Sequence, residues 1–378
     1  MGRVCGATRG GVELRVTLDV SAVPAQPAGA GRYVIEIARR LPSAVDTTLV
    51  TQRGDRTRWT NWSPRAEVVD SVPTNRVTRL GFEAWWLSRR GEARRTDIWH
   101  GPHYTMPHHL THPAVVTIHD MTFFSHPQWH ESTKAVFFRQ AIRYASHHAA
   151  ALICVSETTA RDLRDKFNPT MPIVVAPHGV DHERFRPRLD DEWPGELPTH
   201  RPYILFVGTV EPRKGLDVLL DAFRDIAIAD SEVELWIAGQ AGWKTSKWES
   251  QLASHPAASR IRRLGFVSDA ALPIAMSRAS CVVYPSRGEG FGLPVLEALA
   301  CGAPVVTSAG TVMEEVAGGT ARLAPVGDAD ALAHQIELAL AESSGVRRDR
   351  QEASIARARE FTWERSLALH LEAYRLAL

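Results

Sequence analysis

The sequence has few cysteines and no long apolar run, and both shortages exclude whole classes of protein. Its four cysteines, Cys5, Cys154, Cys281 and Cys301, lie far apart without a C-x-x-C pair, which argues against a disulfide scaffold or zinc finger. No apolar stretch approaches the ~18 to 20 residues of a membrane-spanning helix, and no internal repeat is visible. We therefore expect neither a transmembrane protein nor a solenoid.

Net charge is also small, because the 378 residues sum to only +1. A near-neutral chain argues against a dedicated nucleic-acid binder. Residues 1–190 nevertheless hold 25 Lys/Arg against 18 Asp/Glu, so either this half meets an anionic partner or membrane surface, or the excess is ordinary surface variation. Residues 1–13 lack the apolar core of a signal peptide, and we expect a cytoplasmic protein.

Length and composition predict two globular domains. The chain has 378 residues, 44% apolar and 23% charged, which is enough for two buried cores. Buried strands alternate with helical patterns twice along the chain, and this alternation indicates two parallel, doubly wound α/β sheets. We expect an N-terminal domain over residues 1–185, a Pro-rich linker over 186–202 and a C-terminal domain over 203–360. A helix over 361–378 is expected to dock on the first domain.

A glycine-rich segment in the second series is typical of an anion site. Three glycines lie within residues 288–292, and the helix predicted to begin at Leu293 would offer unpaired N–H groups to an anion. Glu289 in the loop and Glu297 one turn inside the helix could accept hydrogen bonds from ligand hydroxyls. The alternative is an ordinary Gly-rich turn with a carboxylate that complements the helix dipole.

A second segment, GTVEPRKG at residues 208–215, carries positive charge at the end of a predicted strand. Arg213 and Lys214 suit a diphosphate, although a solvated turn would look the same in isolation. The coincidence of this loop with the glycine segment favours a bound phosphate ester of a polyol.

With these segments, the sequence resembles the retaining family 4 glycosyltransferases of the GT-B fold, in which two Rossmann-like domains face a central cleft. The residues that carry the resemblance are EGFGLPVLEALACGAPVV, GTVEPRKG and VVAPHGVD. Bacterial mannosyltransferase-like members look closest, because further segments match them: GAGRY at 29–33, WHGPHY at 99–104, TIHDMTFFSHP at 117–127 and VSETTARDL at 155–163.

The resemblance implies roles for the charged residues of the second domain. Glu289 would contact the hydroxyls of the transferred sugar, and Glu297 those of the nucleotide ribose. Lys214, with Arg213 beside it, would balance the charge of the leaving diphosphate. Many members place arginine directly after the loop glycine, where this chain has Thr209, and Arg213 would then supply the missing charge.

The resemblance also implies donor contacts from neighbouring backbone and from the first domain. The expected donor-binding residues after Glu289 are Gly290, Phe291, Gly292 and Leu293. Base recognition would involve Phe266 and Val267 of the GFVSD turn. In the first domain, Gly29 and Gly31 would face the diphosphate and His119 would lie near the transferred sugar, where its imidazole could donate to or orient a hydroxyl. On its own, His119 is equally typical of a core residue.

Ten histidines lie between residues 100 and 148, yet they do not predict a metal site. No cysteine or second carboxylate supplies tetrahedral spacing, and H-E-x-x-H is absent. We expect a histidine-rich surface loop, no catalytic metal and no other cofactor, with Lys/Arg and a helix terminus balancing the diphosphate.

The leading hypothesis is a hexosyltransferase that moves a hexose, mannose from GDP-mannose, to a hydroxyl of a glycan or lipid-linked acceptor. A nucleotide-sugar epimerase of related fold and a non-catalytic sugar-nucleotide-binding protein remain as alternatives. A dehydrogenase is disfavoured because GAGRYV lacks the third glycine of G-x-G-x-x-G, and no P-loop motif occurs.

Residues 76–95 combine aromatic and aliphatic side chains with six arginines. Such a segment suits the headgroup region of an anionic membrane, which would bring the first domain to the inner membrane face as a peripheral protein. The pattern is also typical of a core or acceptor-pocket helix, and this second interpretation is the one the sequence favours.

Overall fold

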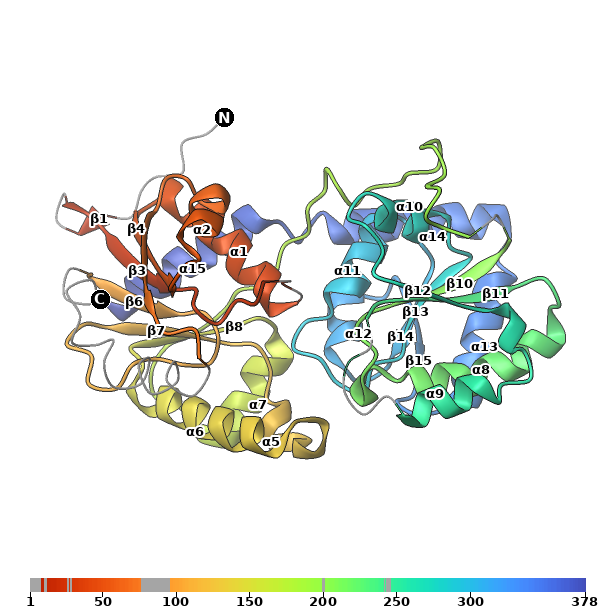
Figure 1. The fold of residues 1–378 in the computed structure, drawn as a ribbon, viewed down its shortest axis with the longest axis horizontal. Coiled ribbons are helices and arrows are strands. Elements are labelled where there is room, and N and C mark those ends of the chain that lie inside the picture. The colour runs from red at the N-terminus through yellow and green to blue at the C-terminus, as the bar shows by residue number, and fades with distance from the viewer. Residues whose placement is uncertain are drawn as a thin grey trace. The chain divides into compact units, whose positions relative to one another are not determined.

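The computed structural model describes residues 8–9, 12–25, 27, 29–75, 96–198, 201–240, 242 and 246–378, and the chain forms two compact units (Figure 1). The first unit comprises Met1–Gly179 and Trp363–Leu378, and the second Val180–Thr362. Each is an α/β structure around one parallel sheet, so the predicted fold class of two doubly wound domains is confirmed.

The first unit contains a seven-stranded parallel sheet in the order β5-β4-β3-β6-β7-β8-β9. Its strands are β3 (Arg15–Asp19), β4 (Asp46–Gln52), β5 (Glu67–Val72), β6 (Ile98–Gly101), β7 (Ala114–Ile118), β8 (Ala151–Cys154) and β9 (Ile173–Val175), and a separate antiparallel pair is formed by β1 (Thr8–Arg9) and β2 (Val12–Glu13). Its helices are α1 (Ala30–Arg40), α2 (Arg56–Trp62), α5 (Thr122–Ser125), α6 (Ser132–His148), α7 (Glu157–Phe167) and α15 (Trp363–Ala377).

Both faces of this sheet are covered because successive strand residues point to opposite sides. Val115 and Ile153 belong to the apolar cluster that includes α15, whereas Val116 and Leu152 belong to the cluster with α6 and α7. Figure 1 shows α1, α2 and α15 on one side of the strands and α5, α6 and α7 on the other. All four of these strand residues are buried, as a sheet with two covered faces requires.

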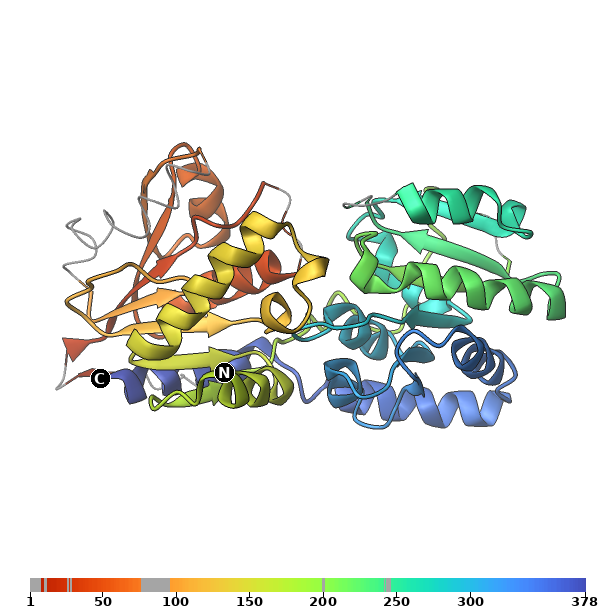
Figure 2. The same cartoon turned by 90° about the horizontal axis from the view of Figure 1, so that it is seen from below.

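The C-terminal helix α15 belongs to the first unit although the second unit separates it from that unit in the sequence (Figure 2). Leu367, Leu371 and Tyr374 of α15 pack against β-strand side chains such as Val16 and Ile98. The helix thus completes one face of the first core.

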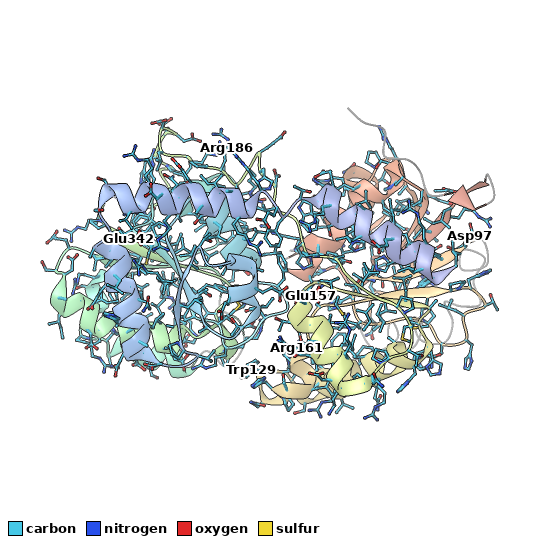
Figure 3. All side chains as sticks on the ribbon, turned by 180° about the vertical axis from the view of Figure 1, so that it is seen from behind. Asp97, Trp129, Glu157, Arg161, Arg186 and Glu342 are labelled. Carbon is cyan, nitrogen blue, oxygen red and sulfur yellow. The ribbon has the colours of Figure 1, made fainter. Side chains whose placement is uncertain are left out.

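The second unit has a six-stranded parallel sheet in the order β12-β11-β10-β13-β14-β15. Its strands are β10 (Tyr203–Val207), β11 (Glu234–Ala238), β12 (Ile261–Gly265), β13 (Cys281–Tyr284), β14 (Val305–Ser308) and β15 (Arg322–Ala324), and its helices are α8 (Leu216–Ala229), α9 (Ser246–Ala253), α10 (Ala271–Arg278), α11 (Leu293–Ala300), α12 (Val312–Ala317), α13 (Ala329–Leu340) and α14 (Ser344–Ala358). Glu342, labelled in Figure 3, lies between α13 and α14 and accepts hydrogen bonds from Arg322 at 3.0 Å and Arg350 at 2.7 Å.

The segment predicted as a linker, residues 186–202, lies within the second unit, which begins at Val180. The reason is its packing against α10: the backbone N–H of Arg188 donates to Ser277 Oγ at 3.1 Å, and Arg278 donates to the Leu189 carbonyl at 2.7 Å. A Pro-rich, aperiodic sequence therefore packs, over residues 186–198, as part of the second unit.

The aromatic and arginine-rich segment 76–95 lies outside the described residues, so the membrane hypothesis stays a prediction. Across the part of the chain that is described, no helix combines the length and apolar character needed to cross a membrane.

Candidate active site

Two loops meet at the carboxyl edge of the second sheet because the strands before them are neighbours. β10 and β13 pair in parallel, and the Arg287 N–H after β13 donates to the Arg213 carbonyl after β10 at 2.7 Å. Gly215 has φ 71°, and a Cβ there would lie 2.1 Å from the Pro285 carbonyl oxygen. Only glycine permits this approach.

A bidentate ion pair fastens the same two loops. Arg287 donates to both carboxylate oxygens of Asp217, the second residue of α8, at 2.9 and 2.8 Å. Bidentate pairs fix orientation as well as distance. The loop after β13 is therefore held at a defined position relative to the short 3-10 turn Pro212–Lys214.

This arrangement brings three predicted site residues into direct contact. Lys214 Nζ donates to Glu289 Oε1 at 2.6 Å, and Arg213 Nη1 donates to Glu289 Oε2. Arg213 Nε also pairs with Glu211 Oε1 at 2.8 Å. The Lys214 and Glu289 side chains are only 11% and 9% exposed, so the ion pairs are shielded from water.

Two hydroxyl groups that sequence reasoning missed complete the cluster. Tyr284 donates to Glu289 Oε1 at 3.1 Å and accepts a hydrogen bond from Lys214, and Ser286 donates to the same carboxylate oxygen at 2.7 Å. Both residues are fully or almost fully buried. The available signal was their position, since Tyr284 ends a buried strand and Ser286, two residues later, begins the glycine segment.

Electrostatics fix the protonation state of the central carboxylate. Burial raises the pKa of Glu289, but the adjacent Arg213 and Lys214 outweigh burial and bring that pKa to about 2. Burial raises the pKa of Tyr284 well above its usual range, and the neighbouring Glu289 adds to this shift. At neutral pH the cluster therefore contains an ionised carboxylate and a neutral phenol.

The glycine segment leads into a helix as predicted. Gly292, at φ 93°, is the N-cap of α11, which begins at Leu293. Phe291 is buried and packs edge-to-face on Phe361 with ring centroids 5.8 Å apart, whereas Gly290 is partly exposed. Glu297 lies about one turn inside α11 and is 9% exposed.

The predicted base-binding residues lie farther along the same sheet edge. Phe266 follows β12 and is 67% exposed, while Val267 beside it is buried. Thr209 follows β10 and is exposed. β11 separates β10 from β12 in the sheet, so Phe266 and Val267 lie two strands away from the loop after β10.

In the first unit, the predicted residues also lie at the carboxyl ends of strands. Gly29, at φ 44°, is the N-cap of α1, and Gly31 is buried in its first turn. His119 follows β7 and contacts Tyr33 of α1 edge-to-face, with ring centroids 5.0 Å apart. The N-terminus of α1 and His119 therefore belong to one region of this unit.

The tautomer of His119 follows from its hydrogen bond. Nε2 lies 2.8 Å from the Pro102 carbonyl, which can only accept, so Nε2 carries the proton and Nδ1 offers a lone pair. Burial lowers the pKa of His119, which keeps the ring neutral. In this tautomer, Nδ1 can accept a hydrogen bond and cannot donate one.

The predicted histidine-rich surface loop is wrong for two of its members. His100 is completely buried and His119 is 6% exposed. His100 Nε2 lies 2.9 Å from Thr117 Oγ1 and its Nδ1 lies 2.8 Å from the Tyr374 hydroxyl. These partners allow a polar ring to lie in the core, which a sequence pattern cannot show.

The same network continues to α15. The Tyr33 hydroxyl lies 2.9 Å from Thr117 Oγ1 and 2.7 Å from His370 Nε2, and His370 Nδ1 lies 2.7 Å from the Ser366 carbonyl. Because a carbonyl only accepts, every donor in the chain is determined: His370 donates to Ser366, Tyr33 to His370, and Thr117 to Tyr33. His100 then donates to Thr117, and Tyr374 donates to His100.

The described residues do not form an evident metal-binding site. Within the described ranges, no group of three or more His, Cys, Asp or Glu side chains is placed to hold a metal ion. His108 and His148 instead stack on the two sides of Tyr144, with ring centroids 4.0 and 4.2 Å from it.

The chain is similar to known proteins over most of its length. O-antigen chain mannosyltransferase B of Escherichia coli is 31% identical over 92% of this chain and 96% of its own. Sucrose-phosphate synthase of Thermosynechococcus elongatus superposes with a TM-score of 0.75 at 21% identity, covering 96% of this chain and 98% of that one. HepE of Anabaena, solved with UDP and glucose, superposes with a TM-score of 0.73 at 17% identity over 95% and 99% of the chains.

Two family descriptions divide the chain between them. Residues 27–184 match the Glycosyltransferase Family 4 domain, and residues 188–361 match the Glycosyl transferases group 1 domain. The predicted enzyme class, a hexosyltransferase of the GT-B fold, agrees with these matches and is confirmed. The chain belongs to the family 4, group 1 glycosyltransferases.

Proposed function

We propose that this glycosyltransferase moves mannose from GDP-mannose to a hydroxyl of a glycan or lipid-linked acceptor, with retention of anomeric configuration. One observation carries the proposal: an ionised carboxylate, Glu289, lies between Lys214 and Arg213 at the start of a glycine-capped helix. The E. coli relative is named a mannosyltransferase, which supports mannose as the sugar.

The cluster matches the needs of a nucleotide-sugar donor. Lys214 and Arg213 provide two positive charges for the diphosphate, and the N-terminus of α11 adds backbone N–H groups from Gly290 to Leu293. Glu289 then faces the sugar hydroxyls, and Glu297 the ribose. Phe266 and Val267 would contact the base, with Thr209 at the same edge of the sheet.

Glu289 is a sugar clamp in this mechanism, and no residue forms a covalent intermediate. A carboxylate with a pKa of about 2 holds protons weakly and is a poor general base at neutral pH. The leaving diphosphate takes the proton of the acceptor hydroxyl on the face that it departs from. The protein mainly orients the reactants and stabilises the charge that develops on the diphosphate.

The first unit would contribute His119 and the N-terminus of α1. The lone pair of His119 Nδ1 accepts a hydroxyl of the transferred sugar, and Gly29 and Gly31 leave space for the diphosphate. We expect neither a metal nor another cofactor to take part, since the two cations and the helix terminus balance the diphosphate.

The experiment is a thermal-shift screen with GDP, UDP and ADP sugars, followed by turnover of GDP-mannose with mannose-containing acceptors. We expect GDP-mannose to raise the melting temperature most, and nucleotide release to require an acceptor, which an epimerase would not need. NMR of the product's anomeric proton tests retention. No shift with any nucleotide sugar would overturn the proposal.

A cytoplasmic location and peripheral membrane contact form part of the same proposal, and the membrane contact rests on the composition of residues 76–95. Liposome flotation at low salt tests the membrane contact. Stronger recovery with anionic than with neutral vesicles supports a lipid-linked acceptor, whereas equal recovery or none indicates a soluble one.

A further inference from the structure

The four hydrogen-bond donors around Glu289 are of two kinds. Lys214 and Arg213 are cations, and Tyr284 and Ser286 are neutral hydroxyls. On the proposed function, on which this inference rests, the donor diphosphate engages the two cations. Glu289 and the diphosphate are both anions, so they compete for Lys214 and Arg213.

Once the diphosphate is bound, the hydrogen bonds from Tyr284 and Ser286 are the ones that still hold the Glu289 carboxylate among those of the described residues. Lys214 carries no acceptor, so the Tyr284 oxygen accepts from it and the single phenolic proton goes to Glu289 Oε1. The nearest acceptor of the Ser286 hydroxyl is also Glu289, at 2.7 Å, against 3.0 Å for the Arg213 carbonyl. Neither bond depends on the cations being free.

Both hydroxyls are placed by rigid parts of the fold. Tyr284 is the last residue of β13, is 1% exposed, and stacks on Phe206 of β10 with ring centroids 6.4 Å apart. Ser286 is 0% exposed and follows two residues later. Their oxygens therefore stay fixed while the charged groups exchange partners.

We propose that Tyr284 and Ser286 are positioning residues that keep the Glu289 carboxylate directed at the sugar hydroxyls after the diphosphate has engaged Lys214 and Arg213. Both hydroxyls donate to Glu289 Oε1, so on this proposal they act through the carboxylate and not on the nucleotide. Their loss should therefore reduce the rate of transfer without weakening nucleotide binding.

Steady-state kinetics with GDP-mannose, together with calorimetric titration of GDP, test this role in Tyr284→Phe and Ser286→Ala. Each variant should lower kcat about tenfold, as loss of a hydrogen bond to a charged group does, with donor KM and GDP Kd within about twofold of wild type. Tyr203→Phe is the matched control, because it removes another buried hydroxyl of this unit that donates to the Ala275 carbonyl at 2.7 Å. It should leave kcat unchanged.

A double-mutant cycle with Glu289→Gln separates positioning from general destabilisation. If Tyr284 acts through the Glu289 carboxylate, Tyr284→Phe adds less than about twofold in the Glu289→Gln background. An equal loss in both backgrounds, or a kcat near wild type in both single variants, overturns the inference and leaves the proposed function intact. Wild-type enzyme that binds no GDP overturns both.

Discussion

The two units each bury a polar cluster near the carboxyl edge of their sheet, and the clusters differ in charge. In the first unit, five side chains form a directed hydrogen-bond chain that contains no ionised group: Tyr33, His100, Thr117, His370 and Tyr374. In the second, Glu289 and Glu211 pair with Arg213 and Lys214. The first cluster holds a helix in place, whereas the second places two cations beside a buried carboxylate.

The neutral chain begins and ends on α15. Tyr374 and His370 belong to that helix, whereas the groups between them come from α1, β6 and β7. A fully paired neutral network stabilises one arrangement at low electrostatic cost, because no ion is removed from water. The network thus fixes the register of a helix that the second unit separates from the rest of its core.

The ionic cluster, in contrast, buries ionised groups. A buried carboxylate is costly unless it is paired, and Glu289 is paired with both Lys214 and Arg213 in the unliganded protein. If Lys214 or Arg213 is removed, or if a competing anion engages them, the ionised Glu289 becomes less favourable in its buried position. The difference between the units teaches that burial of polar groups alone does not indicate a binding site, whereas a buried cluster of ionised groups is the stronger candidate.

The largest effect is expected from breaking the ionic cluster. Lys214→Ala and Glu289→Gln should each lower turnover at least about a hundredfold, because each removes a contact to developing charge or to the sugar. Circular dichroism should show an intact fold. Lys134→Ala is a control, since Lys134 pairs with Glu131 on the surface of α6. Near-wild-type rates in both site variants would mean that the site is misplaced.

Acid should affect the neutral cluster before the ionic one. Burial lowers the pKa of His370 to about 4, so the unfolded chain binds a proton near pH 6.5 while the folded ring stays neutral. The free energy of unfolding therefore falls as pH drops below 6.5, by about 2 kcal/mol at pH 5 from His370 alone, and levels off below pH 4. The contribution of Glu289, whose pKa is about 2, is complete above pH 4.5 and is lost only toward pH 2.

Urea unfolding at pH 7 and pH 5, with limited proteolysis to identify the unit that opens, measures this difference. Cleavage should appear first in the first unit, and a His370→Gln variant should show a weaker pH dependence. A second unit that opens first at pH 5 would contradict the assignment.

A smaller effect is expected from one hydroxyl of the neutral chain. Tyr374→Phe leaves the Nδ1 lone pair of His100 without its donor, which should cost about 1 to 2 kcal/mol. In a unit of this size the melting temperature should fall by roughly 3 to 6 °C. GDP binding should be unchanged, and Tyr144→Phe, at a partly exposed ring between two histidines, should leave the melting temperature unchanged.

The sequence alone predicts the elements whose pattern is local. The strand-to-loop junctions at GTVEPRKG and SRGEGFGLP contain their own glycines and charges, so both loops and the start of α11 at Leu293 were predictable. Strands β4 and β5 were not, because DTTLVTQ and EVVDSV mix polar residues with short apolar runs; β4 is ordered by pairing with β3, and the edge strand β5 by pairing with β4.

The polar contacts were less predictable than the loops. Contact between Lys214 and Glu289, 75 residues apart, depends on the pairing of β10 with β13. The burial of His100 depends on Tyr374, 274 residues away, and on a helix that returns to the first unit. A pattern within one segment records neither distance, so the neutral chain of the first unit could not be inferred from the sequence.

The smallest effect is expected from Phe266, which follows the edge strand β12 of the second unit. Phe266 is 67% exposed after β12, so its replacement by serine removes little packing and should leave the melting temperature within about 1 °C. If the ring stacks on the nucleotide base, Phe266→Ser should raise the GDP Kd about fivefold, because base–aromatic stacking contributes about 1 kcal/mol or more. Calorimetric titration of GDP measures this change, and Ile228→Ser, at an apolar residue 81% exposed in α8, is the control. An unchanged Kd for Phe266→Ser would indicate that the backbone of the turn recognises the base. If Phe266→Ser raised the GDP Kd as much as Lys214→Ala does, the base, and not the diphosphate, would provide most of the binding energy in this unit.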